Sequence, residues 1–275
     1  MPKKFRYNLL SNAFNDKDIK VGIDVLKSRN ITISKITNKF EKYFAKKIGA
    51  KYALMTNSGS SANLLAFSCL TNPLNDDKID DDSEVIIPAV CWSTSLWPIL
   101  QNKLKPVFVD INIDNFNIDL DKIEKKITKK TKAILVIHVL GTSANMDKLI
   151  SLTKKYNLDL IEDTCESLGA SYGKKKLGTF GRFGTYSFYY SHQITSGEGG
   201  MIICNDFKDY NILRSLRSHG WSRDTIFHKH FTKKFSNLDN RFLFIGPGYN
   251  LRPTEIQSAI AFNQFKRLNE LMTIR

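Results

Sequence analysis

The sequence predicts an α/β protein with a mostly parallel β-sheet covered by helices. Short apolar runs rich in β-branched residues alternate with helical patterns over much of the chain. Six runs read as strands: 83–90, 105–112, 132–141, 158–166, 184–190 and 199–205. A strand, helix, strand repeat gives parallel neighbours, because the crossover helix returns the chain to the same edge of the sheet. We therefore expect ligands on the loops at the carboxyl ends of these strands.

The segments between and after these strands are consistent with that architecture. Acidic residues fill 72–84, which predicts a solvated loop. Residues 145–157 place Met146, Leu149 and Leu152 on one helical face. Beyond residue 207 the pattern becomes helical and aromatic, and 256–275 predicts one amphipathic helix that ends the chain.

Composition limits the class of protein and its partners. The 275 residues, 42% of them hydrophobic, can bury a large core in one big domain or two modest ones. The net charge of +14 comes from lysines spread along the whole chain, which favours a compositional bias and anionic small molecules over a nucleic-acid surface. Four scattered cysteines predict reduced thiols and no metal site. Without a signal-peptide or membrane-spanning pattern, we expect a cytoplasmic protein.

A turn of small residues precedes a helical run at 55–67, "MTNSGSSANLLAF". Free backbone amides at a helix N-terminus favour an anion, so this turn is a candidate phosphate site. Gly59 permits close approach of a phosphate and Ser60 adds a hydroxyl donor. Simple helix capping by the same residues is an equal alternative at this point.

Three further residues stand next to predicted strands. Asp163, in "IEDTCE", follows an apolar run and is able to pair with a pyridinium nitrogen, a helix cap or surface ion pair being the alternative. Trp92 is able to stack on an aromatic cofactor, although a core tryptophan is the commoner case. Ser187 is able to donate to a phosphate, although strand serines usually face solvent.

Together these motifs resemble the DegT-StrS family of sugar aminotransferases. The resemblance runs through "NSGSSANL", "VFVDI", "IEDTCESLGA", "GTYSFYYSH", "GEGG" and "GPGYNLRPTEIQSAIA". It implies the fold type I of pyridoxal-phosphate (PLP) enzymes, with a mixed, mostly parallel seven-stranded sheet flanked by helices. It also implies a large domain at 1–250 and, at 251–275, the start of a C-terminal small domain that is largely missing.

The resemblance assigns roles to particular residues. Gly59, Ser60 and Ser187 would hold the cofactor phosphate, Trp92 would stack on its ring, and Asp163 would bind the ring nitrogen. Asn250 resembles the residue that reaches the cofactor of a neighbouring subunit, which implies a homodimer with shared sites.

One position departs from the aminotransferases. Where these enzymes have the lysine that binds PLP covalently, this chain has His192, and no lysine lies between Lys176 and Lys208. PLP or its amine form, pyridoxamine phosphate (PMP), would then be held noncovalently. Histidine still transfers protons near neutral pH, so a catalytic base is expected here rather than an ordinary surface or core histidine.

Lysine to histidine is the change that marks the sugar 3-dehydratases of the family, which the chain resembles most. Glu166 agrees, because the aminotransferases generally have glutamine there, near the phenolic oxygen of the cofactor. The implied reaction removes the C3 hydroxyl of a nucleotide-linked sugar, GDP-4-keto-6-deoxy-D-mannose, with L-glutamate restoring PMP. His219 and Arg223 are weaker candidates for substrate contacts, a solvated Arg223 being about as plausible.

Other functions stay open at this point. A sugar aminotransferase is one alternative, and a 3-dehydratase for CDP-4-keto-6-deoxyglucose is another. The iron-sulfur relative that acts on CDP-sugars needs a cysteine cluster in its second half, whereas Cys204 is the only cysteine after Cys165. A catalytically inactive binding homologue is the third alternative.

Overall fold

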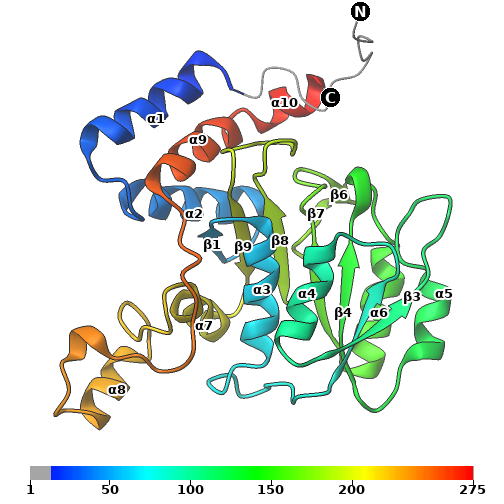
Figure 1. The fold of residues 1–275 in the computed structure, drawn as a ribbon. Helices are drawn as coiled ribbons and strands as arrows, with labels where there is room; N and C mark the ends of the chain where they lie inside the picture. The colour runs from blue at the N-terminus through cyan, green and yellow to red at the C-terminus, as the bar shows by residue number, and fades with distance from the viewer. Residues whose placement is uncertain (1–13, 275) are drawn as a thin grey trace, which may run out of the picture.

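A computed structural model describes residues 14–274 of the chain (Figure 1). Residues 1–13 lie outside the described residues. The prediction that this segment is part of the 1–250 domain, and the prediction that it is not a signal peptide, therefore concern residues that the structure does not describe. No helix in the described part is long and apolar enough to cross a membrane. The predicted division at residue 250 stays a prediction.

Seven strands form the main sheet in the order β1-β9-β8-β5-β4-β2-β3. Their bounds are β1 Tyr52–Thr56, β2 Glu84–Pro88, β3 Lys105–Val109, β4 Thr131–Ile137, β5 Asp159–Asp163, β8 Phe183–Ser187 and β9 Gly200–Cys204. β9 pairs antiparallel with both β1 and β8, and the other pairings are parallel. The predicted mixed, mostly parallel sheet is confirmed, and each of the six predicted runs overlaps a strand, β4 and β8 beginning one residue earlier than predicted.

The sequence analysis missed three strands and misjudged one helix. β1 was not predicted, nor was the hairpin of β6 (Ser171–Tyr172) and β7 (Lys175–Lys176). The single terminal helix expected at 256–275 is wrong, because two helices occupy this region, α9 (Glu255–Phe265) and α10 (Leu268–Ile274). Arg267 lies at the break, and its side chain donates to the buried carboxylate of Asp18 on the N-terminal helix α1 (Asp16–Ser28).

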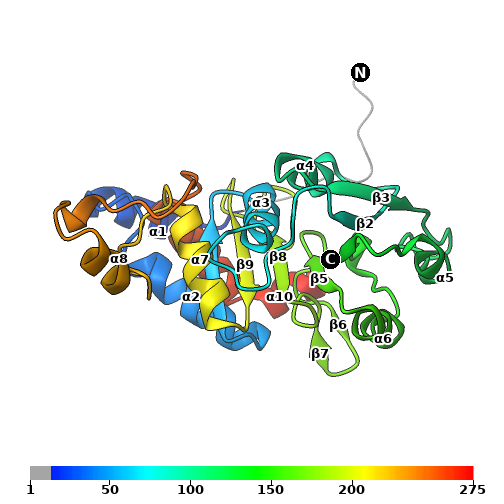
Figure 2. The same ribbon diagram turned by 90° about the horizontal axis from the view of Figure 1, so that it is seen from below.

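Helices cover both faces of the sheet (Figure 2). The remaining α-helices are α1 Asp16–Ser28, α2 Lys35–Ile48, α3 Gly59–Leu70, α4 Ser93–Gln101, α5 Leu120–Ile123, α6 Met146–Tyr156, α7 Phe207–Arg217 and α8 His228–Lys234. Short 3-10 turns occur at η1 Glu124–Lys126, η2 Val139–Gly141 and η3 Asn240–Phe242. α3, α4 and α7 lie on one face, and α2 and α6 lie on the other.

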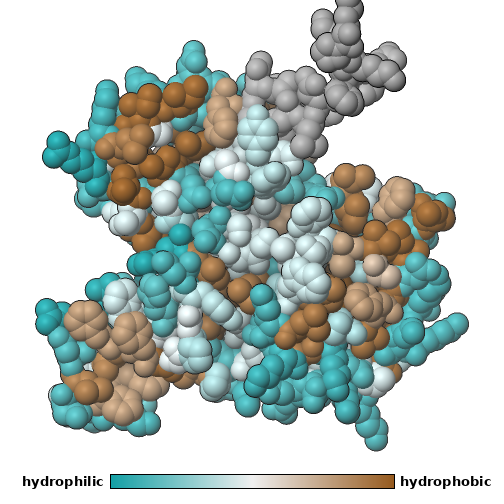
Figure 3. All heavy atoms as spheres, viewed as in Figure 1, coloured by the Kyte–Doolittle hydropathy of each residue, from teal (hydrophilic) through white to brown (hydrophobic). Residues whose placement is uncertain are grey.

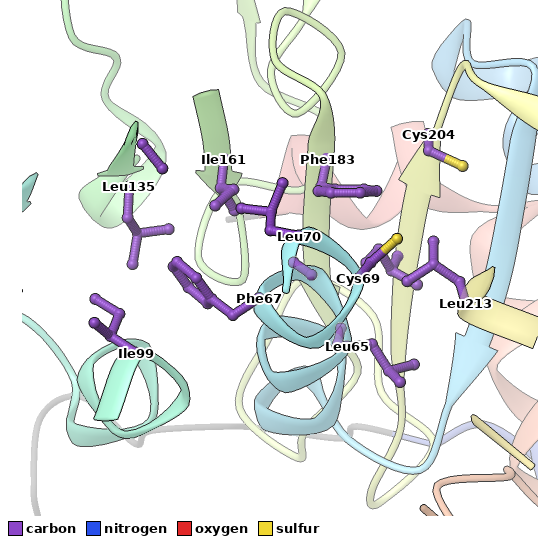
Figure 4. Close-up of a cluster of buried hydrophobic side chains, with 14 of the residues drawn as sticks. Leu65, Phe67, Cys69, Leu70, Ile99, Leu135, Ile161, Phe183, Cys204 and Leu213 are labelled. Atoms are coloured by element: carbon purple, nitrogen blue, oxygen red, sulfur yellow. The ribbon is translucent and has the colours of Figure 1, made fainter. Parts of the chain in front are cut away.

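Period-two alternation along the strands divides the core between these two faces. In β1, Leu54 packs with the α3 cluster, whereas its neighbours Ala53 and Met55 pack with α2 and α9. Figure 4 shows α3 against the strands, with Ile99 of α4 on the side of Phe67 and Leu213 of α7 on the opposite side. α3 is buried nearly all round, which explains why it reads as apolar without a polar stripe.

Candidate active site

The sheet brings four strand ends together at one edge. Thr56 at the end of β1 pairs with Gly200 at the start of β9, and Gly200 also pairs with Ser187 at the end of β8. Asp163 ends β5, which is the next strand after β8. Because every strand but β9 runs the same way, the loops that carry the candidate residues leave from this edge.

The N-terminus of α3 lies against the end of β8. A Cβ atom added at Gly59 would lie 2.6 Å from Cβ of Ser187 and 2.9 Å from Sγ of Cys165, so only glycine fits there. Ser58 is the N-cap of α3 and its Oγ accepts from the Ser61 amide, so a serine of this turn does cap the helix, and Gly59 and Ser60 follow the cap. The first turn of α3 therefore lies directly against the end of β8.

The hydroxyls of Ser60 and Ser187 lie beside this helix N-terminus and can form further hydrogen bonds. Ser60 donates to Thr94 Oγ1 on α4 at 2.9 Å. Ser187 is 7% exposed and its Oγ accepts from the Tyr189 amide at 3.2 Å, so it does not face solvent as strand serines usually do. The two hydroxyls and the α3 amides form a polar cradle of the kind that holds a phosphate.

Asp163 is buried, with 4% of its surface exposed. Its carboxylate accepts from Asn63 Nδ2 and Ser95 Oγ, both at 2.8 Å, and from the Cys165 amide at 3.1 Å. These donors are neutral, and no ion pair found within residues 14–274 includes Asp163. Its burial corrects the alternative of a surface ion pair, and no helix begins there for it to cap.

A buried carboxylate without a cation is costly, since neutral donors offset only part of its lost hydration. A pyridinium N–H would supply the missing positive charge. The donor set and the burial of Asp163 therefore fit the ring nitrogen of PLP or PMP.

Trp92 immediately precedes α4 and is 75% exposed, so the alternative of a core tryptophan is wrong. The same helix supplies Thr94 to Ser60 and Ser95 to Asp163. α4 therefore places an exposed indole next to two side chains that contact the candidate cofactor residues.

The two cysteine thiols of this region are held in the protonated form. Burial, and then the charge of Asp163, raises the pKa of Cys91 and raises that of Cys165 well above its usual value. All four cysteines are free, as expected. Within residues 14–274, His, Cys, Asp and Glu form no cluster suited to a metal ion.

His192 lies in the loop 188–199 that joins β8 to β9, and it is half-buried. Its amide donates to Tyr189 O at 3.1 Å, and its ring stands edge-on to Tyr189 with 6.0 Å between centroids. The following side chain, Gln193, donates through Nε2 to the Glu166 carbonyl. Glu166 is half-buried and accepts the Leu140 amide at 2.9 Å. The structure thus joins the histidine loop to the loop that follows Asp163.

The remaining candidates lie on the segment after α7. His219 Nε2 is 3.3 Å from the Arg252 guanidinium, and Arg223 is exposed with its guanidinium 4.3 Å above the Trp221 ring. Asn250 is exposed, although the Asn57 amide just before α3 donates to the next carbonyl, that of Leu251. None of these three is hydrogen-bonded to Asp163, Ser187 or Gly59 in the part of the chain described.

Sequence analysis did not identify Asn63, Thr94 and Ser95 as site residues. Asn63 is the clearest omission, because its amide side chain is buried within α3, and Thr185 Oγ1 donates to its oxygen at 2.6 Å. A buried asparagine fixed at one end and donating to a carboxylate at the other orients that carboxylate. An amide side chain within a helix that the core covers on nearly all sides is the signal that identifies it.

Comparison with known proteins places the chain in a family. Residues 13–275 match the DegT/DnrJ/EryC1/StrS aminotransferase family. The chain is 39% identical over 271 residues to GDP-4-keto-6-deoxy-D-mannose 3-dehydratase of Escherichia coli O55:H7, covering 98% of this chain and 70% of that protein. The Yersinia pseudotuberculosis protein of the same name is 38% identical, with 98% and 69% covered. The chain thus spans about 70% of the length of these relatives.

Solved structures agree in fold. A variant of GDP-4-keto-6-deoxymannose-3-dehydratase with histidine replaced by asparagine, and with bound GDP-perosamine, superposes with a TM-score of 0.91 at 38% identity, covering 98% of this chain and 70% of that one. The same enzyme with a trapped PLP-glutamate geminal diamine gives 0.87 at 36% identity, covering 96% and 69%. The predicted fold type I of PLP enzymes is confirmed. From its sequence and its structure alike, the chain belongs to the DegT/DnrJ/EryC1/StrS aminotransferase family.

Proposed function

We propose that this chain removes the C3 hydroxyl of a nucleotide-linked 4-keto-6-deoxy sugar, using PMP held noncovalently and L-glutamate to restore it. GDP-4-keto-6-deoxy-D-mannose is the proposed substrate. The observation that carries the proposal is His192, in a loop at the cofactor edge where an aminotransferase has lysine. Two solved structures of relatives support it. One is a 3-dehydratase variant in which a histidine is replaced by asparagine, and the other is a variant in which a histidine is replaced by lysine and the preceding serine by asparagine.

When bound, PMP supplies an amine for the sugar keto group and a ring that withdraws electrons. Asp163 would bind the ring nitrogen and keep it protonated. Gly59, Ser60 and Ser187 would hold the phosphate, and the exposed face of Trp92 would cover the ring. Glu166 would lie near the phenolic oxygen, with its carboxylate already oriented by the Leu140 amide.

His192 would accept the proton removed at the C4' carbon of the cofactor and would return it later. An imidazole suits this work because its ordinary pKa lies near neutrality. Without a lysine amine at this position, the cofactor amine has no competitor from the protein. That difference favours loss of the hydroxyl over completed amine transfer.

Two other parts of the proposal concern the subunit and the substrate. We propose a homodimer with shared sites, in which Asn250 reaches the cofactor of the other subunit. The exposure of Asn250 supports this role, and the exposed apolar residues Ile19, Ile23 and Leu26 on α1 support a subunit interface (Figure 3). His219 and Arg223 would contact the substrate, with the guanidinium facing the diphosphate.

Borohydride reduction tests the cofactor linkage. The protein is loaded with PLP, reduced, and analysed by mass spectrometry, with His192→Lys as the positive control. We expect a reduced adduct on His192→Lys and none on the wild type. An adduct on the wild-type chain would contradict noncovalent binding.

Product analysis tests the reaction. The PMP-loaded protein is incubated with GDP-4-keto-6-deoxymannose and glutamate, and in parallel with the CDP-linked sugar. We expect loss of the C3 oxygen from the GDP-sugar. A 4-amino sugar would instead establish an aminotransferase, turnover of the CDP-sugar alone would reassign the nucleotide, and absence of sugar binding would support an inactive homologue.

A further inference from the structure

Two hydrogen bonds tie the loop 188–199, which carries His192, to other parts of the fold. On one side Gln193 donates to the Glu166 carbonyl. On the other side the Thr195 amide donates to Gln264 Oε1 on α9 at 2.8 Å, in a contact that is buried at both ends. His192 lies one residue before the first contact and three before the second. The backbone around the histidine is therefore tied both to the loop after β5 and to α9.

The orientation of the Gln264 amide is set by Asp18 on α1. Gln264 Nε2 donates to Asp18 Oδ2 at 3.3 Å. A carboxylate accepts hydrogen bonds but does not donate them, so the NH2 group of Gln264 must face Asp18. The amide oxygen consequently faces the Thr195 N–H. The flipped amide would set oxygen against carboxylate and NH2 against N–H.

Asp18 is itself fully buried and fixed from α9. Asn263 Nδ2 donates to Oδ1 at 2.7 Å, and the Arg267 guanidinium lies 2.9 Å from Oδ2. Asp18 also completes the capping box of α1 with Asn15. The carboxylate therefore cannot turn away from Gln264 without breaking several hydrogen bonds.

We propose that Gln264 is a positioning residue for His192. It transmits the fixed geometry of α1 and α9 to the histidine loop through one backbone hydrogen bond. The proposal rests on the proposed role of His192 as the base that moves the C4' proton. Proton transfer demands hydrogen-bond distances, and a displacement of about 1 Å costs on the order of 100-fold in rate. Loss of the Gln264 oxygen leaves the buried Thr195 N–H unpaired and frees the loop to shift.

The test compares Gln264→Leu with Asn263→Leu. Both variants remove one donor to Asp18 from the same helix, but only Gln264→Leu also removes the acceptor for Thr195. The first readout is the His192 ring proton resonance in the protein without cofactor, assigned among the five histidines by its loss in His192→Asn. The second is kcat and KM of the PMP-loaded enzyme with the sugar and glutamate.

For Gln264→Leu we expect the His192 resonance to move or split and kcat to fall about 10- to 100-fold, with KM for the sugar within about twofold. Asn263→Leu is expected to keep the wild-type resonance and kcat. A Gln264→Leu variant that matches Asn263→Leu in both readouts would overturn the proposal. So would a rise in KM at unchanged kcat.

Two further measurements keep the outcome decisive. If Gln264→Leu does not fold, Gln264→Met replaces it, because methionine has a similar volume and offers only a weakly accepting sulfur in place of the amide oxygen. In the wild type, the Thr195 amide is expected to exchange with deuterium more slowly than exposed loop amides, and fast exchange would refute the hydrogen bond. A wild type without dehydratase activity, but with the His192 resonance still dependent on Gln264, would refute the proposed function and leave the positioning role standing.

Discussion

At the scale of single residues, the surroundings of Asp163 are better explained by ligand binding than by stability. The side chain is buried among neutral donors, and Asn63 and Ser95 orient it from two different helices. The sequence predicted its place at a strand end. It did not predict the donors, because Asn63 and Ser95 lie 100 and 68 residues away along the chain and meet Asp163 only after the sheet has formed.

Asp163→Asn is expected to weaken PMP binding by about 10- to 100-fold, because a charge-assisted hydrogen bond is worth about 1.5–3 kcal/mol. Equilibrium titration of PMP by absorbance measures the change. Thermal melting of the apo protein is measured alongside, because an amide cannot accept from Asn63, Ser95 and the Cys165 amide together and some loss of stability is expected. Asp159→Asn is the matched control, because Asp159 begins the same strand and pairs with Arg182. Equal weakening in both variants would contradict the assignment.

The thiols beside Asp163 give a prediction on pH. Burial and the negative charge of Asp163 both disfavour a thiolate, so the pKa values of Cys91 and Cys165 lie above the ordinary value. We expect their alkylation by iodoacetamide to stay slow through about pH 9 and to rise only beyond it. Peptide mass spectrometry after timed labelling measures the rates, with the unfolded chain as control. Labelling of the folded protein at pH 8 as fast as in the unfolded chain would refute the raised pKa values.

At the scale of elements, strand β5 directs two adjacent carboxylates to opposite faces of the sheet. Asp163 faces α3 and α4, whereas Glu162 faces the opposite side and accepts the amides of Gly178, Phe180 and Gly181 at 2.6–2.8 Å. The "IED" pattern shows two acids, and strand alternation implies that they point to opposite faces. Which one meets the cofactor depends on the helices packed on each face.

Glu162→Gln is expected to destabilise the protein by about 2–4 kcal/mol, because an amide cannot accept from all of these N–H groups and also from His138. Urea unfolding measures the free energy. Glu124→Gln is the control, since Glu124 forms an exposed pair with Lys155 and little change is expected there. A Glu162→Gln variant as stable as Glu124→Gln would show that the loop before β8 does not depend on this carboxylate.

The elements that sequence reasoning missed have physical explanations. β1, "YALMT", contains alanine, leucine and methionine, which favour helices, and it becomes a strand through its pairing with β9. β6 and β7 are two residues each, too short for any periodicity. The break between α9 and α10 lies in a continuous helical pattern. Arg267 at this break turns to Asp18, a contact that no local sequence reveals.

At the scale of the whole molecule, the order of the strands in the sheet differs from their order along the chain. β9 follows β8 in the chain, yet it separates β8 from β1, and this insertion brings Gly200, Ser187 and Thr56 to one edge. The six predicted strands and the position of Asp163 were sufficient for the class of fold. The meeting of Gly59 and Ser187 depends on the pairing order, which the sequence did not predict, and only the family resemblance grouped the two residues.

The proposed sharing of sites between subunits makes a prediction for mixed dimers. His192→Asn and Asn250→Ala are each expected to be inactive alone, because each removes a residue from every site. A heterodimer would contain one site with both substitutions and one intact site. Co-expression of the two variants should therefore restore about a quarter of wild-type activity, since about half of randomly formed dimers are mixed. If Asn250 served the site of its own chain, both sites of the mixed dimer would carry one substitution. Co-expression would then restore no activity, and the two arrangements are separated by one assay.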